Sequence, residues 1–266
     1  NSGLEIAQGK YIIFVDSDDY VTENMCHLLY EAAKKYEADV VYGGIFYADG
    51  EKIKESKVVT KERVWKGKQE VKDLLLDFIA TEPNEKKDTI MEVSVWKALF
   101  RKKVFDEYDI SFVSERQFIS EDVIFDIDYL SKCNCVVAIP EPVYFYCVNP
   151  NSLSKVFRTD RFNKVKKLYK EILKKLIPIY GEELSNRRGD RFLIARARTN
   201  ARQIIRHEKI IGKNKMMKAL HNICEDQDMN EIFQRYPIHL LPLKYRLVAY
   251  LMKYRCYHLL KIILGR

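Results

Sequence analysis

The segment that most constrains the fold is 10–19, whose sequence is KYIIFVDSDD. Its five consecutive apolar residues, 11–15, predict a strand buried on both faces, as strands of parallel sheets are. The run ends abruptly at three carboxylates, Asp16, Asp18 and Asp19. Because ligands of open α/β sheets collect at the carboxyl ends of such strands, this cluster is a candidate ligand site.

Three carboxylates so close in the chain would repel one another and raise each other's pKa if nothing balanced their charge. A divalent cation removes this conflict, and hard oxygen ligands suit Mg²⁺ or Mn²⁺. Because Mg²⁺ commonly fills the rest of its shell with substrate phosphates, the cluster indicates a metal–phosphate site. The alternative is a solvated turn or a cap on the helix expected from about residue 23 to 36, since Asp favours both positions.

Strands and helices alternate in the first half of the chain, which predicts an α/β layered architecture. The expected strands are 39–47, 135–140 and 143–148, with a polar hairpin edge at 52–64; the expected helices are 69–80 and 121–130, with a helix or strand–helix corner at 93–105. Segment 110–118 is expected to be extended.

The second half changes character near residue 157, after which apolar residues recur at helical spacing. The expected helices are 161–179, 184–208, 215–225 and 243–264. We therefore divide the chain into a sheet-containing domain, 1–156, and an all-helical C-terminal region, 157–266.

Positive charge gathers at the C-terminus. Seven basic residues and no acidic residue follow Glu231, whereas the formal net charge of the whole chain is +8. The rest of the chain is nearly neutral, which argues against nucleic acid as a partner. The predicted helix 243–264 has an apolar face flanked by Lys and Arg, so we expect a basic amphipathic helix lying on an anionic membrane surface. The alternative is a terminal helix packed on the helical region with a solvated basic rim.

Other sequence features exclude several classes of protein. The six cysteines show no CxxC or zinc-ligand spacing, which indicates reduced thiols in a cytosolic setting. No apolar run approaches the roughly 18 residues that a membrane span requires.

Four ordered motifs resemble a known family. Residues 1–25, NSGLEIAQGKYIIFVDSDDYVTENM, are similar to the middle of a family 2 glycosyltransferase domain of the bacterial kind that builds capsular and other cell-surface polysaccharides. The further motifs are a Trp-x-x-Leu-Phe-Arg segment at 96–101, a Glu-Asp pair at 121–122 and a Tyr-rich strand ending in Asn-Ser-Leu-Ser at 144–154. Each motif is weak alone, and the resemblance rests on their order over roughly residues 1–160.

The resemblance implies a fold and a reaction. The fold would be an incomplete GT-A (Rossmann-like) mixed sheet with flanking helices. The reaction would be an inverting, metal-dependent transfer of a sugar from a nucleotide-diphosphate donor, a UDP-sugar, to a glycan or lipid-linked acceptor. Such an enzyme would work in the cytoplasm, peripherally at the inner face of the cell membrane.

Site residues follow from the same resemblance. Asp18 and Asp16 would hold Mg or Mn, with Asp16 also near the ribose and Asp19 supporting the pair. Asp122 would be the base that activates the acceptor hydroxyl, because a hydroxyl is a poor nucleophile near neutral pH. Glu121 beside it and Trp96, as an acceptor platform, complete the expected substrate site. Without the resemblance, the Glu-Asp pair could simply suit a helix N-terminus, and the tryptophan could belong to the core.

One departure from the family concerns the start of the chain. Family members begin with strands that bind the base of the nucleotide, and this sequence starts at an Asn-x-Gly just before the DxD strand. We therefore expect half of the nucleotide site to be absent, and the chain alone to show little or no transferase activity.

Two other functions remain open on the sequence. A phosphatase of the haloacid dehalogenase type also places Asp-x-Asp after an apolar strand. That family has Thr or Val at the position where this chain has Tyr20. The other is a non-catalytic membrane-surface interaction protein derived from a transferase domain. Phosphate release from an aryl phosphate would identify the first, and the absence of UDP binding would favour the second.

Overall fold

The computed structural model describes residues 1–91, 94–114, 116–149, 158 and 160–265, and the chain divides into two compact units. The sheet unit comprises 1–78, 91–114 and 120–156, and the helical unit comprises 79–90, 115–119 and 157–266. Segments 79–90 and 115–119 thus belong with the C-terminal helices although they lie in the first half of the sequence.

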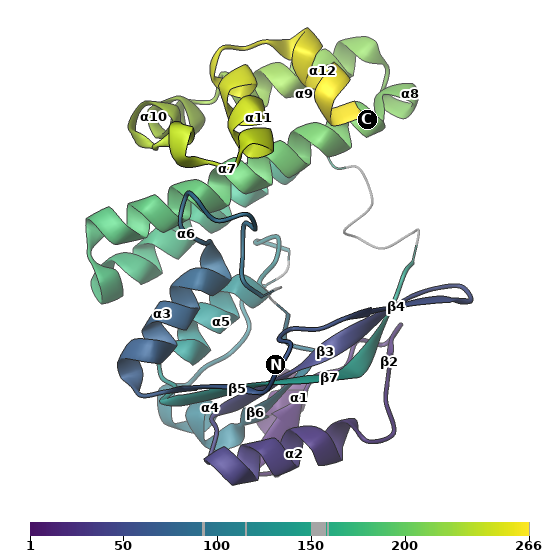
Figure 1. Cartoon of the computed structure of the whole chain (residues 1–266), viewed down its shortest axis with the longest axis vertical. Helices are drawn as coiled ribbons and strands as arrows, with labels where there is room; N and C mark the ends of the chain where they lie inside the picture. The colour runs from purple at the N-terminus through teal and green to yellow at the C-terminus, as the bar shows by residue number, and fades with distance from the viewer. Residues whose placement is uncertain (92–93, 115, 150–157, 159, 266) are drawn as a thin grey trace. The chain divides into compact units, whose positions relative to one another are not determined.

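The sheet unit is built on a mixed sheet of seven strands (Figure 1). The strands are β1 (Tyr11–Ile13), β2 (Tyr20–Val21), β3 (Val40–Asp49), β4 (Lys52–Ser56), β5 (Arg63–Lys66), β6 (Ala98–Arg101) and β7 (Cys135–Cys147). Their order is β1-β6-β3-β7-β2, with β4 paired to β3 and β5 paired to β7. Among the residues that the structure describes, β3 and β7 run parallel and the other pairings are antiparallel.

Helices cover both faces of this sheet (Figure 1). They are α1 (Ser2–Ile6), α2 (Met25–Tyr36), α3 (Lys68–Ile79), α4 (Lys102–Tyr108) and α5 (Asp122–Leu130). On one face, Leu29 and Ala33 of α2 pack with the buried strand residues Val41 and Val137. On the other face, aromatic rings from β6, α4 and α5 meet, as where the Phe100 ring lies 5.4 Å from that of Phe125. Alternate residues of each strand supply the two cores, as the period of two requires.

The structure corrects two predicted strands. β1 is short and antiparallel to β6, and Ile12 is its buried residue while Val15 is 51% exposed. It is therefore not buried on both faces, because in the described structure it lies at the edge of the sheet with one neighbour. The two strands expected at 135–140 and 143–148 are one long strand, β7. Irregular pairing opposite Gly44 lets it continue through its two prolines.

A glycine makes this irregular pairing possible. A Cβ built on Gly43 would lie 2.5 Å from the Val143 side chain of β7, closer than real Cβ contacts allow. The Val143 side chain fits there because Gly43 has none, and a Cβ on the next residue, Gly44, would lie 3.2 Å from the Pro142 backbone. The predicted strand–helix corner at 93–105 is confirmed as β6 followed directly by α4.

The helical unit contains α6 (Arg161–Tyr180), α7 (Glu182–Arg206), α8 (Glu208–Ile211), α9 (Lys213–Cys224), α10 (Gln227–Arg235), α11 (Leu243–Lys253) and α12 (Tyr257–Gly265), with a 3₁₀ turn at Ile238–Leu240. The long helix α7 holds segment 79–90 through buried arginines. Arg188 donates to the Ala80 carbonyl at 2.7 Å, and Arg191 donates to the Glu85 carbonyl at 3.1 Å. These contacts explain why segment 79–90 belongs to this unit.

The prediction of one continuous helix at 243–264 is wrong, because the helix is interrupted between α11 and α12. Arg255 adopts a left-handed φ of 57°, which an uninterrupted helix does not allow. Each half buries one side: Val248 and Met252 of α11 and Leu260 of α12 are buried. Two of the basic residues are also engaged, since Lys253 donates to the Phe233 carbonyl at 2.7 Å and Lys261 pairs with Glu208.

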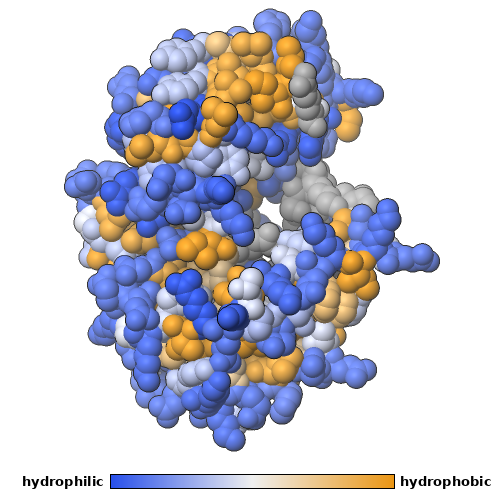
Figure 2. Space-filling view, in the orientation of Figure 1, coloured by the Kyte–Doolittle hydropathy of each residue, from blue (hydrophilic) through white to orange (hydrophobic). Residues whose placement is uncertain are grey.

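Apolar side chains nevertheless remain on the surface of these two helices. Figure 2 shows hydrophobic residues gathered over α11 and α12. The exposed ones are Leu243, Leu247, Tyr254, Leu259 and Ile262. Among the described helices, none is both long enough and apolar enough to cross a membrane.

Candidate functional site

The turn that carries the aspartates is fixed to β7 by one tyrosine. The Asp16 backbone N–H donates to the Tyr144 hydroxyl at 3.0 Å, and that hydroxyl donates to Asp19 Oδ2 at 2.9 Å. The backbone N–H of Cys147 donates to Asp19 Oδ1 at 2.7 Å. Both oxygens of Asp19 are therefore occupied by the protein, and this residue holds the turn in place.

The carboxylates of Asp16 and Asp18 differ from that of Asp19. Both residues are exposed, and within the described part of the chain neither side chain forms a hydrogen bond or an ion pair. Partial burial raises the pKa of Asp16, and the neighbouring charges of Asp19, Asp18 and Glu121 raise it further. Negative charge thus accumulates here without a described partner.

The capping explanation for this cluster does not hold. Helix α2 begins at Met25 with Asn24 as its cap residue, and none of the three aspartates caps it. The Thr22 hydroxyl instead donates to the Val143 carbonyl at 3.2 Å. The aspartates therefore have no helix-capping role that would account for them.

The Glu-Asp pair lies within electrostatic range of the aspartate turn. Asp122 opens α5, with Glu121 before it, and Glu121 makes no capping hydrogen bond through its side chain. Burial raises the pKa of Asp122 to about 7, with smaller contributions from the charges of Glu121 and Asp16. Ser120, just before the pair, has a left-handed φ of 59°, an uncommon conformation that clusters at functional sites.

A buried lysine lies beneath this pair. Lys97 is 2% exposed, and its positive charge lowers the pKa of both Asp122 and the fully buried Asp126. Burial and the charge of Asp122 outweigh it at Asp126, whose pKa is raised well above its usual range. Asp126 also raises the pKa of the buried Tyr42 hydroxyl. Asp122 therefore belongs to a network of interacting charges.

Trp96 lies against the tyrosine that fixes the aspartate turn. Its ring centroid is 4.4 Å from that of Tyr144 and 5.7 Å from that of Tyr146. The ring is partly buried and packs against the core cluster under α2. This position combines a core contact with a surface that remains accessible.

The donor set at the turn fits a hard divalent cation only in part. No group of three or more His, Cys, Asp or Glu side chains that could hold a metal occurs among the described residues. Two unpartnered carboxylates do fit an ion such as Mg²⁺, which takes one or two protein carboxylates and fills its shell with phosphate oxygens and water. The site accordingly suits an ion shared with a phosphate ligand.

Sequence reasoning missed two members of this arrangement. Tyr144 alternates with apolar residues along a strand, a pattern typical of a core residue, and its ring is indeed buried. Its hydroxyl, however, bridges Asp16 and Asp19. Lys97 carries no signal in the sequence, since a lysine is normally exposed.

The fold and this carboxylate arrangement define the class to which the chain belongs. The family model described as glycosyl transferase family 2 matches residues 1–109, which include β1, the aspartate turn and β6. Residues 1–109 are therefore similar to that family, and the sheet unit has the GT-A-type mixed sheet with flanking helices.

Several curated proteins are similar in sequence. The uncharacterized glycosyltransferase EpsJ of Bacillus subtilis is 27% identical over 163 residues, which cover 59% of this chain and 43% of EpsJ. TarP of Staphylococcus aureus, a poly(ribitol-phosphate) beta-N-acetylglucosaminyltransferase, is 25% identical over 241 residues, covering 86% of this chain and 68% of TarP. The chain thus spans less than half the length of EpsJ.

A solved structure is similar in fold. TarS residues 1–349 of S. aureus, crystallised with UDP-GlcNAc, matches with a TM-score of 0.62 and 15% identity, over 100% of this chain and 69% of that one. At this identity the match concerns the fold alone.

Proposed function

We propose that the protein transfers a sugar from a nucleotide-diphosphate donor to a hydroxyl of a glycan or lipid-linked acceptor. The observation that carries the proposal is a pair of unpartnered carboxylates, Asp16 and Asp18, of which Asp16 lies within electrostatic range of Asp122, a carboxyl group whose pKa is about 7. Binding of a divalent cation with a phosphate-bearing ligand needs the unpartnered carboxylates. Activation of a hydroxyl near neutral pH needs a carboxyl group with a pKa near 7.

The relatives support the identity of the donor and the setting of the reaction. TarS was crystallised with UDP-GlcNAc and with UDP, so we infer a UDP-sugar as donor. The names of TarP and its relatives favour an acceptor in bacterial cell-surface polymer synthesis. In this role the chain would work at the inner face of the cell membrane.

The donor half of the site would consist of the aspartate turn. Asp18 and Asp16 would hold Mg²⁺ or Mn²⁺, which when bound offsets the negative charge that grows on the leaving diphosphate. Asp19 would keep its structural role, because the Tyr144 hydroxyl and the Cys147 N–H already occupy its oxygens. Asp16 would also lie near the ribose, with Glu121 at the edge of the site.

The acceptor half would be centred on Asp122. Its carboxylate takes the proton of the acceptor hydroxyl as the hydroxyl oxygen forms a bond to the anomeric carbon. The bond from that carbon to the diphosphate oxygen breaks, and the diphosphate leaves with the electron pair. A single displacement of this kind inverts the anomeric centre, and Trp96 would offer the acceptor a ring to pack on.

The test is the substitution Asp122→Asn, which keeps the size of the side chain and removes the base. The test uses the protein together with the base-binding strands that the family resemblance leads us to expect, and there we expect the transfer rate to fall by roughly 10²- to 10⁴-fold, the usual contribution of a general base. UDP-sugar binding, measured by calorimetry with Mn²⁺, should remain within a few-fold of the unsubstituted protein. Asp128→Asn, on the same helix, is the control, and a rate near normal in Asp122→Asn would show that the base lies elsewhere.

A second function, docking on membranes, has its own observation. The exposed apolar residues of α11 and α12 lie among basic side chains, which is the composition of interfacial helices. This function is compatible with transfer to a lipid-linked acceptor, and it would also fit a non-catalytic interaction protein.

A further inference from the structure

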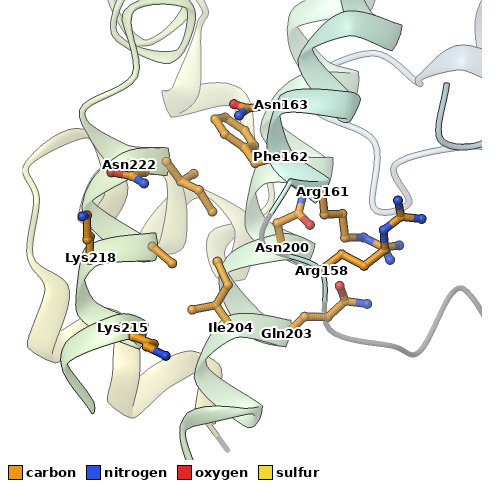
Figure 3. Close-up of a pocket in the computed structure, with 12 residues that line it drawn as sticks. Arg158, Arg161, Phe162, Asn163, Asn200, Gln203, Ile204, Lys215, Lys218 and Asn222 are labelled. Carbon is orange, nitrogen blue, oxygen red and sulfur yellow. The ribbon is translucent and has the colours of Figure 1, made fainter. Parts of the chain in front are cut away.

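The helical unit contains a cavity that shares no residue with the carboxylate site. Its volume is about 240 Å³, and it lies between α6 and α7 on one side and α9 on the other (Figure 3). Small-molecule sites commonly measure roughly 300 to 1,000 Å³, so this cavity would hold one small unit.

The charged lining of the cavity is entirely basic. Arg158, Arg161, Lys215 and Lys218 line it, and no Asp or Glu does among the residues that the structure describes. Arg158 is paired with Asp160 at 3.3 Å, but Lys215 and Lys218 are exposed and make no described ion pair. Burial and the charge of Arg158 lower the pKa of Arg161, so positive charges already crowd this end. An anion would relieve that repulsion.

One amide in the wall has no partner. Asn200 of α7 is 4% exposed, lines the cavity, and makes no hydrogen bond through its side chain within the described chain. A mostly buried amide ordinarily finds a hydrogen-bond partner, so this one is available to a ligand or water in the cavity. The amides of Asn163 and Asn222 also line the cavity, and Figure 3 shows them on the helices that flank it.

Apart from Gln203, the remaining lining is apolar. Phe162 and Ile204 come from α6 and α7, and Ala219 and Ile223 come from α9. An inorganic ion gains no contact from an apolar surface, whereas the carbon-bound hydrogens of a sugar ring or polyol chain can pack on it. Cations, amides and apolar surface in one small cavity match a molecule with a phosphate, several hydroxyl groups and a carbon skeleton.

We propose that the cavity between α6, α7 and α9 binds a sugar phosphate or polyol phosphate. Lys215 and Lys218 contact the phosphate, together with Arg161. Asn200 and Asn222 donate to and accept from the hydroxyl groups. The phosphate unit could be free in solution or form the headgroup of a lipid, since both present the same chemistry.

The experiment measures binding of glucose 6-phosphate by calorimetry, with glucose and inorganic phosphate as the two halves of the probe. We expect glucose 6-phosphate to bind more tightly than either half, and binding to weaken as salt is added. Lys218→Gln and Asn200→Ala should each weaken binding about tenfold or more. The first removes a hydrogen bond from a charged group to the phosphate, and the second removes the hydrogen bonds of a buried amide. The control is Lys213→Gln, an exposed lysine of α9 that does not line the cavity.

Folding of the variants is verified by helical circular dichroism, and Lys218 is exposed, so its substitution should leave the helical unit intact. Equal affinity for inorganic phosphate and glucose 6-phosphate would overturn the proposal, as would equal weakening by Lys213→Gln. Binding that persists in Asp18→Asn separates this site from the proposed donor site. A parallel assay with phosphatidylinositol vesicles identifies the source: Lys218-dependent vesicle binding indicates a lipid headgroup, and its absence indicates a soluble ligand.

Discussion

The hydroxyl of Tyr144 is the group that most directly holds the aspartate turn, so Tyr144→Phe is an informative change. The ring, which is buried against Trp96, remains in place. The substitution removes the bond donated to the Asp19 carboxylate, about 1.5–3 kcal/mol, and the bond accepted from the Asp16 N–H, about 0.5–1.5 kcal/mol. Because Asp16 is exposed and water can replace its bond, we expect a total loss of about 2 kcal/mol.

Both tryptophans of the chain, Trp65 and Trp96, lie in the sheet unit. Tryptophan fluorescence during urea unfolding therefore reports the stability of that unit. The matched control is Tyr146→Phe, two residues along the same strand, whose ring also lies near Trp96 and whose hydroxyl has no described hydrogen bond. We expect the control to change stability by no more than about 0.5 kcal/mol. Equal stability of the two variants would refute the role of the Tyr144 hydroxyl.

Two further predictions concern pH and membranes. Because the folded protein raises the pKa of Asp122 from 3.8 to about 7, it binds this proton more tightly than the unfolded chain. Without metal, the free energy of unfolding of the sheet unit should therefore fall as pH rises from about 4 to 7. Asp122→Asn should flatten this trend. The same slope in both proteins would show that Asp122 is not responsible. Co-sedimentation with anionic liposomes should decrease when Leu247→Ser and Leu259→Ser are combined, because both side chains are exposed. Ile53→Ser, at an exposed apolar residue of β4, serves as the comparison, and unchanged binding by the double variant would exclude this surface.

The predicted helices agree with the structure where an amphipathic pattern is uninterrupted. Helix α3 begins and ends one residue from the expected 69–80, and α5 differs from 121–130 at its start alone. Both lie over the sheet, so the apolar period in the sequence corresponds to a buried face. The C-terminal helix failed differently, because its break at Arg255 uses neither Gly nor Pro and leaves no local signal.

The strands were less predictable because pairing is decided by distant residues. An apolar run such as 11–15 cannot reveal whether one neighbour or two will pair with it. Two strands were expected at 135–140 and 143–148, yet β7 continues through both segments with irregular pairing where Gly44 lies opposite Pro142. At the candidate site, the motif residues could be named from the sequence. The residues that support them could not be named from the sequence. The Tyr144 hydroxyl contacts Asp19 across more than 100 residues of sequence, and Lys97 is buried although lysine is normally exposed.

The central claim is that Asp16 and Asp18 hold a divalent cation together with a nucleotide-diphosphate ligand. Calorimetry of UDP binding with and without Mn²⁺ tests it in the protein together with the base-binding strands that the family resemblance leads us to expect. The proteins compared are the unsubstituted one, Asp18→Asn and the exposed-surface control Asp49→Asn. The claim predicts Mn²⁺-dependent UDP binding that is lost in Asp18→Asn and kept in Asp49→Asn. Mn²⁺-dependent UDP binding of unchanged affinity in Asp18→Asn would contradict it.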